Sequence, residues 1–437
     1  MSESASYVIS ACREHDVKFI RLWFTDIGGA LKSFAITRDE LTDALANGTG
    51  FDGSTMTGFN PDHEADMVAV PDASTFTILP YRPSESSAPR MFCDIRFTDG
   101  TPYEGDPRHV LRRALQRAER LGFDHFYVSP ELEYFYFQDA EGTVPLDRGG
   151  YFDYSTDLAF RIRKDMVLAL EKMGIDVEAS HHEVAVGQHE IDFEYADAMT
   201  SADQAITFKF TLKAIAQQHG LHATFMPKPI FGDNGSGMHC HMSLWKDGQN
   251  LFAGDKYAGL SQVALHFIGG ILKHAPAMCA ITNPSTNSYK RLVPGFEAPV
   301  RLAYSYRNRS AALRIPNTGT SPKAKRIEFR TPDPAANIYL CLAALLMAGI
   351  QNKINPGDPL DKDIYGLSPQ ELANVPSVPA TLDRALEHLK EGSAFLRKGD
   401  VFSEDFIETW IDYKYSREII PMQQRPSPYE FMLYFDT

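Results

Sequence analysis

The sequence predicts an α+β fold in two unequal domains, with a sheet of antiparallel or mixed topology. At 437 residues the chain is too long for one ordinary hydrophobic core. The pattern of elements changes near residue 100, and we place the domain boundary there, giving residues 1–100 and 101–437. Beyond it, short strands carry polar residues at every second position. One face of the sheet is therefore expected to be wet, unlike the strands of a doubly wound parallel sheet.

The first domain is expected to contain strands and short helices. Residues 17–24 alternate as a strand does, and residues 25–29 form the turn that follows. Residues 37–46 predict a short helix. Residues 51–54, Phe-Asp-Gly-Ser, are polar and turn-prone, so we predict a loop there.

The second domain is predicted to alternate helices with short strands. Asp106 and Pro107 mark a helix start, because Asp caps free N–H groups and Pro suits the first helical position. Further amphipathic stretches predict helices at residues 157–172, 202–218, 260–274 and 337–348. Short alternating strands are predicted at residues 126–128, 133–137, 237–244 and 326–330.

Composition narrows the function classes. The net charge of −14 disfavours nucleic acid and anionic membrane as partners. No apolar run approaches the length that spans a bilayer, and the N-terminal residues do not resemble a signal peptide. The five scattered cysteines include no Cys-x-x-Cys pair, so neither a disulfide framework nor a thiolate zinc site is indicated. We therefore expect a cytoplasmic protein.

Three predicted strands place chemically active side chains two residues apart, which puts them on one face. The pairs are Glu131 with Glu133, His239 with His241, and Glu328 with Arg330, the last preceded by Arg326. Glu183 and Glu190 lie seven residues apart around a glycine and meet at one site if the chain turns there. Two carboxylates on one face repel each other unless a cation lies beside them, and a divalent metal ion is the simplest such cation.

Each pair also has an ordinary structural interpretation. Paired glutamates usually form a solvated strand face, His-x-His is more often a surface pair than a ligand pair, and Glu-x-Arg is ordinarily a weak ion pair. Together, however, these segments offer several carboxylates and at least one imidazole without thiolates. That combination suits Mg²⁺ or Mn²⁺ better than structural zinc.

Residues 290–330 carry many basic side chains in an otherwise acidic protein. They are Lys290, Arg291, Arg301, Arg307, Arg309, Arg314, Lys323, Lys325, Arg326 and Arg330. A basic surface patch is one interpretation. A clamp for phosphate and carboxylate groups is the other, because guanidinium binds both through paired hydrogen bonds. The sequence has no P-loop motif, so a metal site facing arginines is the favoured arrangement for phosphoryl transfer.

Motifs spread over essentially the whole chain resemble those of type I glutamine synthetases. They occur in the family's order at residues 51–54, 131–133, 180–185, 187–190, 225–229, 234–241, 287–295, 308–310 and 332–337. The resemblance implies a small N-terminal β-grasp domain and a large catalytic domain whose curved, mostly antiparallel sheet is flanked by helices. It also implies a homo-oligomer, a dodecamer of two stacked hexameric rings, with each active site between neighbouring subunits.

The resemblance further implies the reaction. ATP phosphorylates the γ-carboxylate of L-glutamate, because a carboxylate is itself a poor acyl donor. Ammonia then displaces phosphate from γ-glutamyl phosphate to give L-glutamine. ATP is a co-substrate, ammonium and L-glutamate are the other substrates, and two or more Mg²⁺ or Mn²⁺ ions per site are the cofactors.

Binding roles carry over by position in the motifs. The expected ligands of the first metal are Glu133, Glu183 and Glu190, and those of the second are Glu131, His239 and Glu328. The expected substrate-binding residues are Tyr151, Asn234, Gly235, Arg291 and Arg330. The expected nucleotide-binding residues are Glu178, Tyr195, His241, Ser243, Arg309, Arg314, Lys323 and Arg326.

Catalytic roles carry over in the same way. Asp52, supplied by the adjacent subunit, is expected to take a proton from ammonium. Tyr151 and Glu183 fall around the ammonium position. Glu297 lies on a loop that closes over the site and excludes water. Arg309 is expected to stabilise charge on the transferred phosphoryl group.

Alternatives remain at this stage. The closest is a family member that joins glutamate to a polyamine or ethanolamine, although Asp52 and Glu297 favour ammonia. A homologue that only binds ligands and a metal-dependent hydrolase are alternatives of other classes. Pro61 stands where one branch has an arginine used in feedback inhibition, and Tyr365 aligns with a tyrosine that another branch adenylylates.

Overall fold

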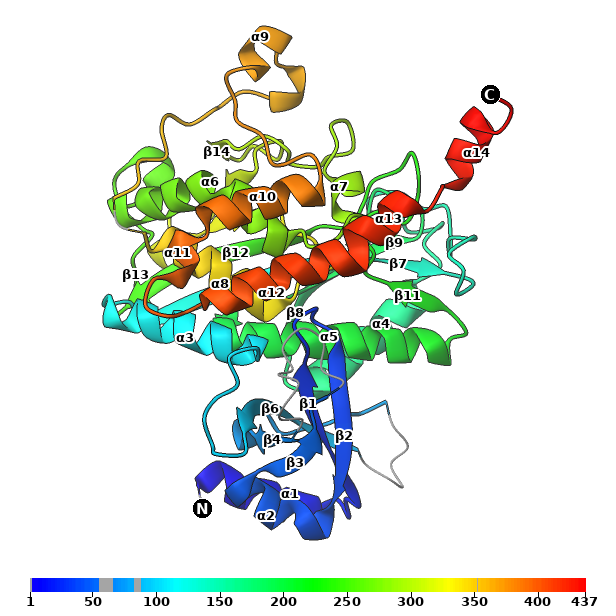
Figure 1. Ribbon diagram of the computed structural model, residues 1–437, viewed down its shortest axis with the longest axis vertical. Helices are drawn as coiled ribbons and strands as arrows, with labels where there is room; N and C mark the ends of the chain where they lie inside the picture. Colours follow the sequence, from blue (N-terminus) through cyan, green and yellow to red (C-terminus); the bar gives the residue numbers. More distant parts are fainter. Residues whose placement is uncertain (1, 55–65, 82–87, 352) are drawn as a thin grey trace.

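The structure is a computed structural model that describes residues 2–54, 66–81, 88–351 and 353–437. Figure 1 shows a small domain at the bottom of the view and a large domain above it. Pro61, the residue discussed above in connection with feedback inhibition, lies outside the described residues.

The small domain is a mixed sheet covered by helices. Its strands are β1 (Phe19–Thr25), β2 (Leu31–Thr37), β3 (Thr49–Asp52), β4 (Asp66–Pro71), β5 (Thr77–Ile78) and β6 (Pro89–Phe97). They run in the order β2-β1-β6-β4-β3, with β5 also on β6, and only the β1–β6 pairing is parallel. Helices α1 (Glu3–Glu14) and α2 (Leu41–Asn47) bury Val8, Cys12 and Leu41 in the same core as the strand residues Ile20 and Leu22.

Three of the four expected elements of this domain are confirmed, including the turn at 25–29, where the Gly29 N–H donates to the Asp26 carbonyl at 3.0 Å, and one is wrong. The strand at 17–24 is β1, and the helix at 37–46 is a short 3₁₀ turn, η1 (Arg38–Glu40), followed by α2. The loop expected at 51–54 instead begins as the end of β3, where Phe51 pairs with Met67. Packing explains the error, since the Phe51 ring lies 5.1 Å from that of Phe24 and 5.7 Å from that of Phe34.

The large domain is built on a ten-stranded sheet whose described order is β14-β15-β16-β12-β7-β9-β8. Its main strands are β7 (His125–Phe137), β8 (Val177–His182), β9 (Gln188–Phe193), β12 (Met238–Lys246), β14 (Tyr304–Tyr306), β15 (Leu313–Ile315) and β16 (Ile327–Phe329). Short strands β10 (Ala196–Asp197) and β11 (His222–Thr224) pair with β7, and β13 (Gln249–Asn250) pairs with β12. All described pairings are antiparallel except β14–β15, as predicted.

Strand β7 is longer than predicted. Residues 126–128 and 133–137 belong to one strand that continues through Pro130, which lies opposite Cys240 of β12. On the other edge of β7, β10 pairs at 127–128 and β9 at 133–135. Pro130 lies in the gap between them, where a missing N–H costs that edge no ladder hydrogen bond.

Helices pack on the side of the sheet away from the polar face. They include α3 (Pro107–Arg120), α4 (Phe160–Lys172), α5 (Ala198–Gln218), α6 (Gln262–Thr282), α8 (Ile338–Gly349), α10 (Leu382–Gly392) and α12 (Glu404–Lys414). The predicted Asp106 cap is confirmed, since its carboxylate accepts from the N–H of Arg108 at 3.0 Å. Helix α6 runs past the predicted end at 274, through Pro276, because residues 275–282 are largely buried in the core.

Helix α6 also corrects the expectation about apolar runs. By length and composition, residues 262–282 could cross a membrane, with a mean hydropathy of 1.3. In the fold, 67% of that apolar window is buried inside the domain. A core helix has this property, because it must be apolar on most of its faces.

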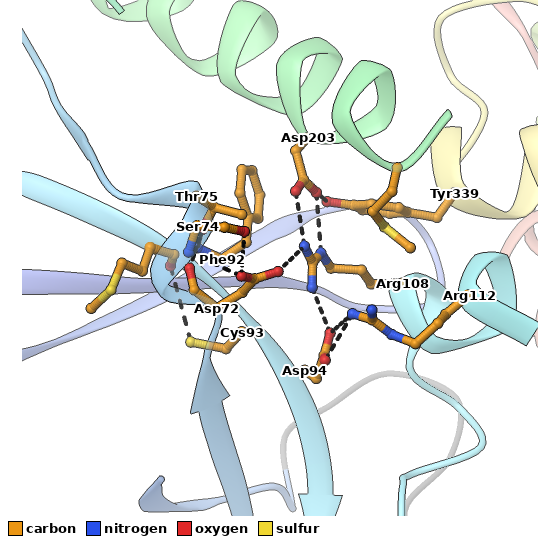
Figure 2. A network of polar contacts seen from close by, with 12 residues as sticks. Asp72, Ser74, Thr75, Phe92, Cys93, Asp94, Arg108, Arg112, Asp203 and Tyr339 are labelled. Carbon is orange, nitrogen blue, oxygen red and sulfur yellow. Dashed lines mark hydrogen bonds and ion pairs between the residues drawn. The ribbon is translucent and has the colours of Figure 1, made fainter. Parts of the chain in front are cut away.

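A buried arginine joins the two domains (Figure 2). Arg108, in the first turn of α3, is 3% exposed. Its guanidinium donates to Asp94 of β6 at 2.6 Å, to Asp72 after β4 at 2.8 Å, and to Asp203 of α5 at 3.0 and 3.2 Å. The Tyr339 hydroxyl of α8 donates to Asp203 as well, at 2.6 Å. Two aspartates of the small domain and one of the large domain therefore share one cation.

The turn between β1 and β2 reaches the large domain at a second point. The side-chain amide of Asn337 donates to the carbonyls of Asp26 and Ile27 at 3.1 and 3.2 Å, while its oxygen caps α8. Gly29 has a φ of 84°, and a Cβ on it would lie 3.0 Å from the Asn337 Cα. Only glycine fits this close approach without displacement.

We predict that Arg108→Met lowers the free energy of unfolding by about 3–5 kcal/mol, because it leaves buried aspartates without their cation. Thermal unfolding followed by calorimetry checks this as a fall in Tm. Arg112→Met is the matched control. Arg112 binds only Asp94 among the described carboxylates and its side chain is 36% exposed, so a loss of about 0–1 kcal/mol is expected. Equal losses in the two variants would contradict the role given to Arg108.

Candidate active site

The two central strands of the large sheet separate polar from apolar side chains residue by residue. On β7, Glu131 and Glu133 face a cavity, while Leu132 and Tyr134 between and after them are fully buried in the core. On β12, His239 faces the same cavity and its neighbours Met238 and Cys240 belong to the core. This is the period-two alternation that the sequence predicts for a sheet with one wet face.

Strand register brings the polar side chains of four strands into one row. Glu133 of β7 lies opposite Glu190 of β9, and Glu131 lies opposite His239 of β12. His241 of β12 lies opposite Glu328 of β16. Side chains that face each other across antiparallel strands are near neighbours, so residues far apart in sequence form one cluster.

The cluster lines a cavity of about 610 Å³. All six expected metal ligands border it: Glu131, Glu133, Glu183, Glu190, His239 and Glu328. The expected substrate and catalytic residues at its wall are Tyr151, Asn234, Gly235, Arg291, Glu297, Arg309 and Arg330, with Arg314 from the nucleotide set. Tyr365 also borders the cavity.

Several sets of these side chains bring ligand atoms within 4.8 Å of one another. The sets at the cavity are Glu131 with His241 and Glu328, Glu131 with Glu190 and His239, and His181 with Glu183 and Glu190. Glu328 is grouped with His241 rather than with His239. Glu133 belongs to none of these sets, although its carboxylate lies 3.7 Å from the His239 Nε2. The Oε2 of Glu133 accepts from the Gly237 N–H at 2.8 Å and from the Gln188 amide at 3.0 Å.

Histidine 181 was not singled out from the sequence. Its Nε2 lies 2.8 Å from a carboxylate oxygen of Glu183 and 3.5 Å from one of Glu190. The adjacent His182 points away into the core, which the alternation of a strand requires. The pair of neighbouring histidines could have indicated one inward and one outward ring.

Electrostatics differ sharply among the carboxylates. Burial raises the pKa of the Glu190 carboxyl well above its usual range, and the nearby Asp192 and Glu133 carboxylates raise it further. Burial would also raise the pKa of Glu131, but His241 and His239 outweigh it and hold that pKa well below its usual range. Neighbouring carboxyls of the cluster therefore have pKa values shifted in opposite directions.

Glu328 is held by arginines. It is fully buried, and its two oxygens accept from Arg314, at 2.5 Å, and from Arg330. Burial opposes ionisation, but Arg330 and His241 lower the pKa of Glu328 to about 2. A buried, ionised carboxylate of this kind can bind a cation. If it does, Arg314 and Arg330 can bind an anionic ligand instead of Glu328.

Three of the expected substrate-binding and loop residues, Arg291, Gly235 and Glu297, are each constrained by a different contact. The Arg291 guanidinium, 4% exposed, donates to the Thr331 carbonyl at 2.8 Å and to the Arg330 carbonyl at 3.2 Å. Gly235 permits a tight approach, because a Cβ there would lie 2.3 Å from the Pro227 carbonyl oxygen. Glu297 has a φ of 54°, in the left-handed region, and its carboxylate accepts from Asn234 at 3.4 Å.

A second cavity of about 310 Å³ adjoins the first. It is lined by six of the eight expected nucleotide-binding residues: Glu178, Tyr195, His241, Ser243, Lys323 and Arg326. The other two, Arg309 and Arg314, border the first cavity. The rings of Tyr195 and Trp245 lie 5.4 and 5.5 Å from that of Tyr127, so the second cavity has an aromatic wall.

Asp192 was missed by sequence reasoning. With Glu131 it borders both cavities, so it lies at their junction. Burial and the Glu131 carboxylate raise the pKa of Asp192 to about 6. The signal was present, because Asp192 lies two residues after Glu190 and therefore on the same face of β9.

Asp52 is the one expected catalytic residue that the single chain does not bring to the cavity. It ends β3 in the small domain and is exposed. The Ser54 hydroxyl and N–H bind its carboxylate, the N–H at 2.8 Å, and keep the pKa of Asp52 below its usual range. Within the described residues Asp52 therefore remains charged and available to a partner at the surface.

We predict that divalent metal binding releases protons near neutral pH, on the order of one per chain, because buried carboxyls such as Glu190 must ionise to bind a cation. Calorimetric titration of the metal-free protein with Mn²⁺, in buffers of different ionisation enthalpy, measures this release. Apparent affinity should rise as the pH rises through about 6, the raised pKa of Asp192 at the cavity wall, because that carboxyl then becomes negatively charged. Glu190→Gln should release fewer protons, and an affinity that does not change with pH would contradict the prediction.

Family models match the chain in two parts. Residues 16–98 match the β-grasp domain of glutamine synthetase, and residues 104–434 match its catalytic domain. The predicted fold class, a β-grasp domain followed by a large domain with a mostly antiparallel sheet flanked by helices, is thereby confirmed.

Relatives and solved structures agree with these matches. The glutamine synthetase of Nostoc sp. is 45% identical over 470 residues, covering 98% of this chain and 99% of that protein. The glutamine synthetase of Methanosarcina mazei is 48% identical over 424 residues, covering 93% and 94%. A GmaS/ADP complex has a TM-score of 0.89 at 31% identity over 100% of both chains. The cryo-EM structure of Plasmodium falciparum glutamine synthetase has a TM-score of 0.89 at 28% identity over 99% of both.

Proposed function

The chain belongs to the glutamine synthetase family, and on that premise we propose that the larger cavity is the active site of a glutamate–ammonia ligase. The reaction consumes ATP, L-glutamate and ammonia and gives L-glutamine, ADP and phosphate. One observation carries the proposal: six carboxylate or imidazole ligands, a group of arginines and the Glu297 loop all border one cavity.

The donor set at this cavity fits a divalent cation that prefers oxygen and imidazole. We assign Glu133, Glu183 and Glu190 to a first Mg²⁺ or Mn²⁺ ion, and Glu131, His239 and Glu328 to a second. Such ions, when bound, supply positive charge beside the transferred phosphoryl group and hold the substrate carboxylate near it. The contacts of Glu133 with Gln188 and Gly237 support its fixed orientation. The His181 ring lies 2.8 Å from Glu183, and the His241 ring lies 2.6 Å from Glu131.

The arginines are assigned to anionic groups. Arg291 and Arg330 are to bind the glutamate, and the backbone contacts of Arg291 support a preorganised guanidinium. Arg309 and Arg314, at the wall of the first cavity, are to face the phosphates of a nucleotide whose base and sugar occupy the second cavity. Arg314 now binds Glu328, so a metal at that carboxylate would free the guanidinium for a phosphoryl oxygen.

We assign the attack of ammonia to the Asp52 side of the site. Ammonium must lose a proton before its nitrogen can attack the acyl phosphate, and an ionised carboxylate is a suitable base. Tyr151 and Glu183 are the cavity residues proposed to face the ammonium. Glu297 is to close the opening, which keeps water from hydrolysing the acyl phosphate.

An oligomer would bring Asp52 to a neighbour's cavity. The C-terminal helix α14 (Pro428–Tyr434) projects from the body of the chain (Figure 1) and contains no buried residue. Its end exposes Phe431, Met432 and Phe435 at 51%, 71% and 74%. Apolar surface of this extent on a projecting helix supports docking on another copy. We therefore propose a homo-oligomer, the dodecamer of two hexameric rings expected from the family. The cytoplasmic location expected from the composition is part of the same proposal.

We expect ATP-dependent phosphate release, measured with glutamate and Mg²⁺ or Mn²⁺, to require ammonium and to yield glutamine. A panel of primary amines and a reaction without an acceptor are the controls. Release that needs methylamine, ethanolamine or a polyamine instead would move the function to a γ-glutamyl-amine ligase. Equal release without any acceptor would indicate a hydrolase.

We also expect complementation between subunits. Asp52→Asn removes the base and Glu328→Gln removes a metal ligand, so each variant alone should lose most of its activity. Dissociating and reassembling the two together should restore activity well above either parent, because some cavities then combine an intact metal site with an intact Asp52 from the neighbour. No recovery in mixed oligomers, confirmed by mass, would show that Asp52 does not act on a neighbour's cavity.

A further inference from the structure

Beneath the floor of the active-site cavity lies a buried polar pair that the reaction scheme does not use. Asp147 and His182 have side chains that are 1% and 0% exposed. The His182 Nε2 lies 2.9 Å from the Asp147 Oδ1, and its Nδ1 lies 2.6 Å from the backbone carbonyl of Glu183. Both nitrogens face acceptors, so the ring donates an N–H on each side.

The His182 ring and the Asp147 carboxylate both form hydrogen bonds to backbone groups of the cavity wall. The carbonyl that the Nδ1 binds belongs to Glu183 itself, the residue assigned to the first metal. The Asp147 carboxylate accepts from the N–H of Gly187 at 3.1 Å and from that of Leu158 at 3.0 Å. The turn from Glu183 to Gly187 is thus fastened at both ends.

The same histidine also holds the opposite wall. Its backbone carbonyl accepts from the N–H of Phe152 at 3.2 Å, next to Tyr151. The loop passes directly over the ring, because a Cβ on Gly149 would lie 2.7 Å from the His182 Nε2. The two cavity residues assigned to the ammonium position therefore both depend on His182: its ring binds the Glu183 carbonyl, and its backbone carbonyl binds the residue after Tyr151.

The hydrogen bonds of this pair indicate a structural role rather than metal binding. Ligand atoms of Asp147, His182 and His189 do lie within 4.8 Å of one another. The His189 Nδ1, however, lies 2.9 Å from the Arg163 guanidinium, which can only donate, so the neutral ring carries its proton on Nε2. Since the His182 nitrogens are donors as well, no imidazole lone pair faces the centre of this group.

We propose that His182 is a positioning residue whose Nδ1 hydrogen bond fixes the Glu183 peptide and thereby sets the affinity of the active site for its first divalent cation. The proposal rests on the proposed function for the assignment of Glu183 to a metal. Partners of this kind behind a metal ligand typically change metal affinity by roughly 10- to 100-fold when they are lost.

Two substitutions of His182 separate positioning from simple loss of structure. His182→Gln can keep the donor toward Asp147, where the Nε2 stood, and loses the donor to the Glu183 carbonyl. His182→Asn can keep the donor to that carbonyl and loses the one toward Asp147. Both leave a buried polar group without a partner, so both are expected to lower Tm to a similar extent.

A second pair of variants acts from the other side of the ring. Gly149→Ala presses a methyl group on the His182 ring, whereas Gly150→Ala, one residue later, meets only ordinary contact 3.6 Å from Asp153. Neither glycine has a positive φ, so alanine fits both backbones. This pair keeps the test available if a His182 variant does not assemble.

The experiment measures the dissociation constant for Mn²⁺ by calorimetry on the full, assembled protein without substrates, and then the KM for Mn²⁺ and kcat with ammonium. We expect His182→Gln and Gly149→Ala to weaken Mn²⁺ binding by roughly 10- to 100-fold, while His182→Asn and Gly150→Ala stay close to the parent. Equal weakening in the Gln and Asn variants, weakening in Asn alone, or no weakening in either would overturn the proposal. Because the binding step needs no turnover, failure here is distinct from failure of the ligase assignment, which the acceptor panel decides.

Discussion

Besides Glu297 on its loop, six acidic side chains face one cavity, and their mutual repulsion is the constraint to which the rest of the site responds. They are Glu131, Glu133, Glu183, Glu190, Asp192 and Glu328. Three of them meet this repulsion differently: guanidinium groups contact Glu328, imidazoles contact Glu131, and burial with nearby carboxylates raises the pKa of Glu190. Bound divalent cations would neutralise these carboxylates directly. The arginines and histidines that now neutralise them lie close enough to do so.

Alternation along each strand was predictable from sequence, whereas the register between strands was not. The spacing of Glu131 and Glu133 fixes their common face without knowledge of the neighbours. That His241 lies opposite Glu328 depends on a pairing between residues 87 positions apart in the chain, which no local pattern encodes. The same limit explains why the proximity of His241 to Glu131 and Glu328 was not predicted.

Other features depended on tertiary contacts that leave little trace in the sequence. Arg108 looks like an ordinary residue of a first helical turn, yet its acidic partners lie 14, 36 and 95 positions away. Phe51 lies in a turn-prone stretch but is drawn into a strand by aromatic neighbours. Asp192 is different, because its spacing from Glu190 predicted its face and the signal was simply not used.

The wall shared by the two cavities determines where the chemistry can occur. In the proposed assignment the nucleotide enters the smaller cavity and glutamate the larger, so the transferred phosphoryl group must pass the junction bordered by Glu131 and Asp192. Two carboxylates repel an anion there unless cations intervene. Without a metal ion the junction would thus oppose transfer of the phosphoryl group, and the ions that Glu131 helps to bind would remove this repulsion. Metal binding would then be needed both to let the phosphoryl group pass between the cavities and to stabilise the charge of the transition state.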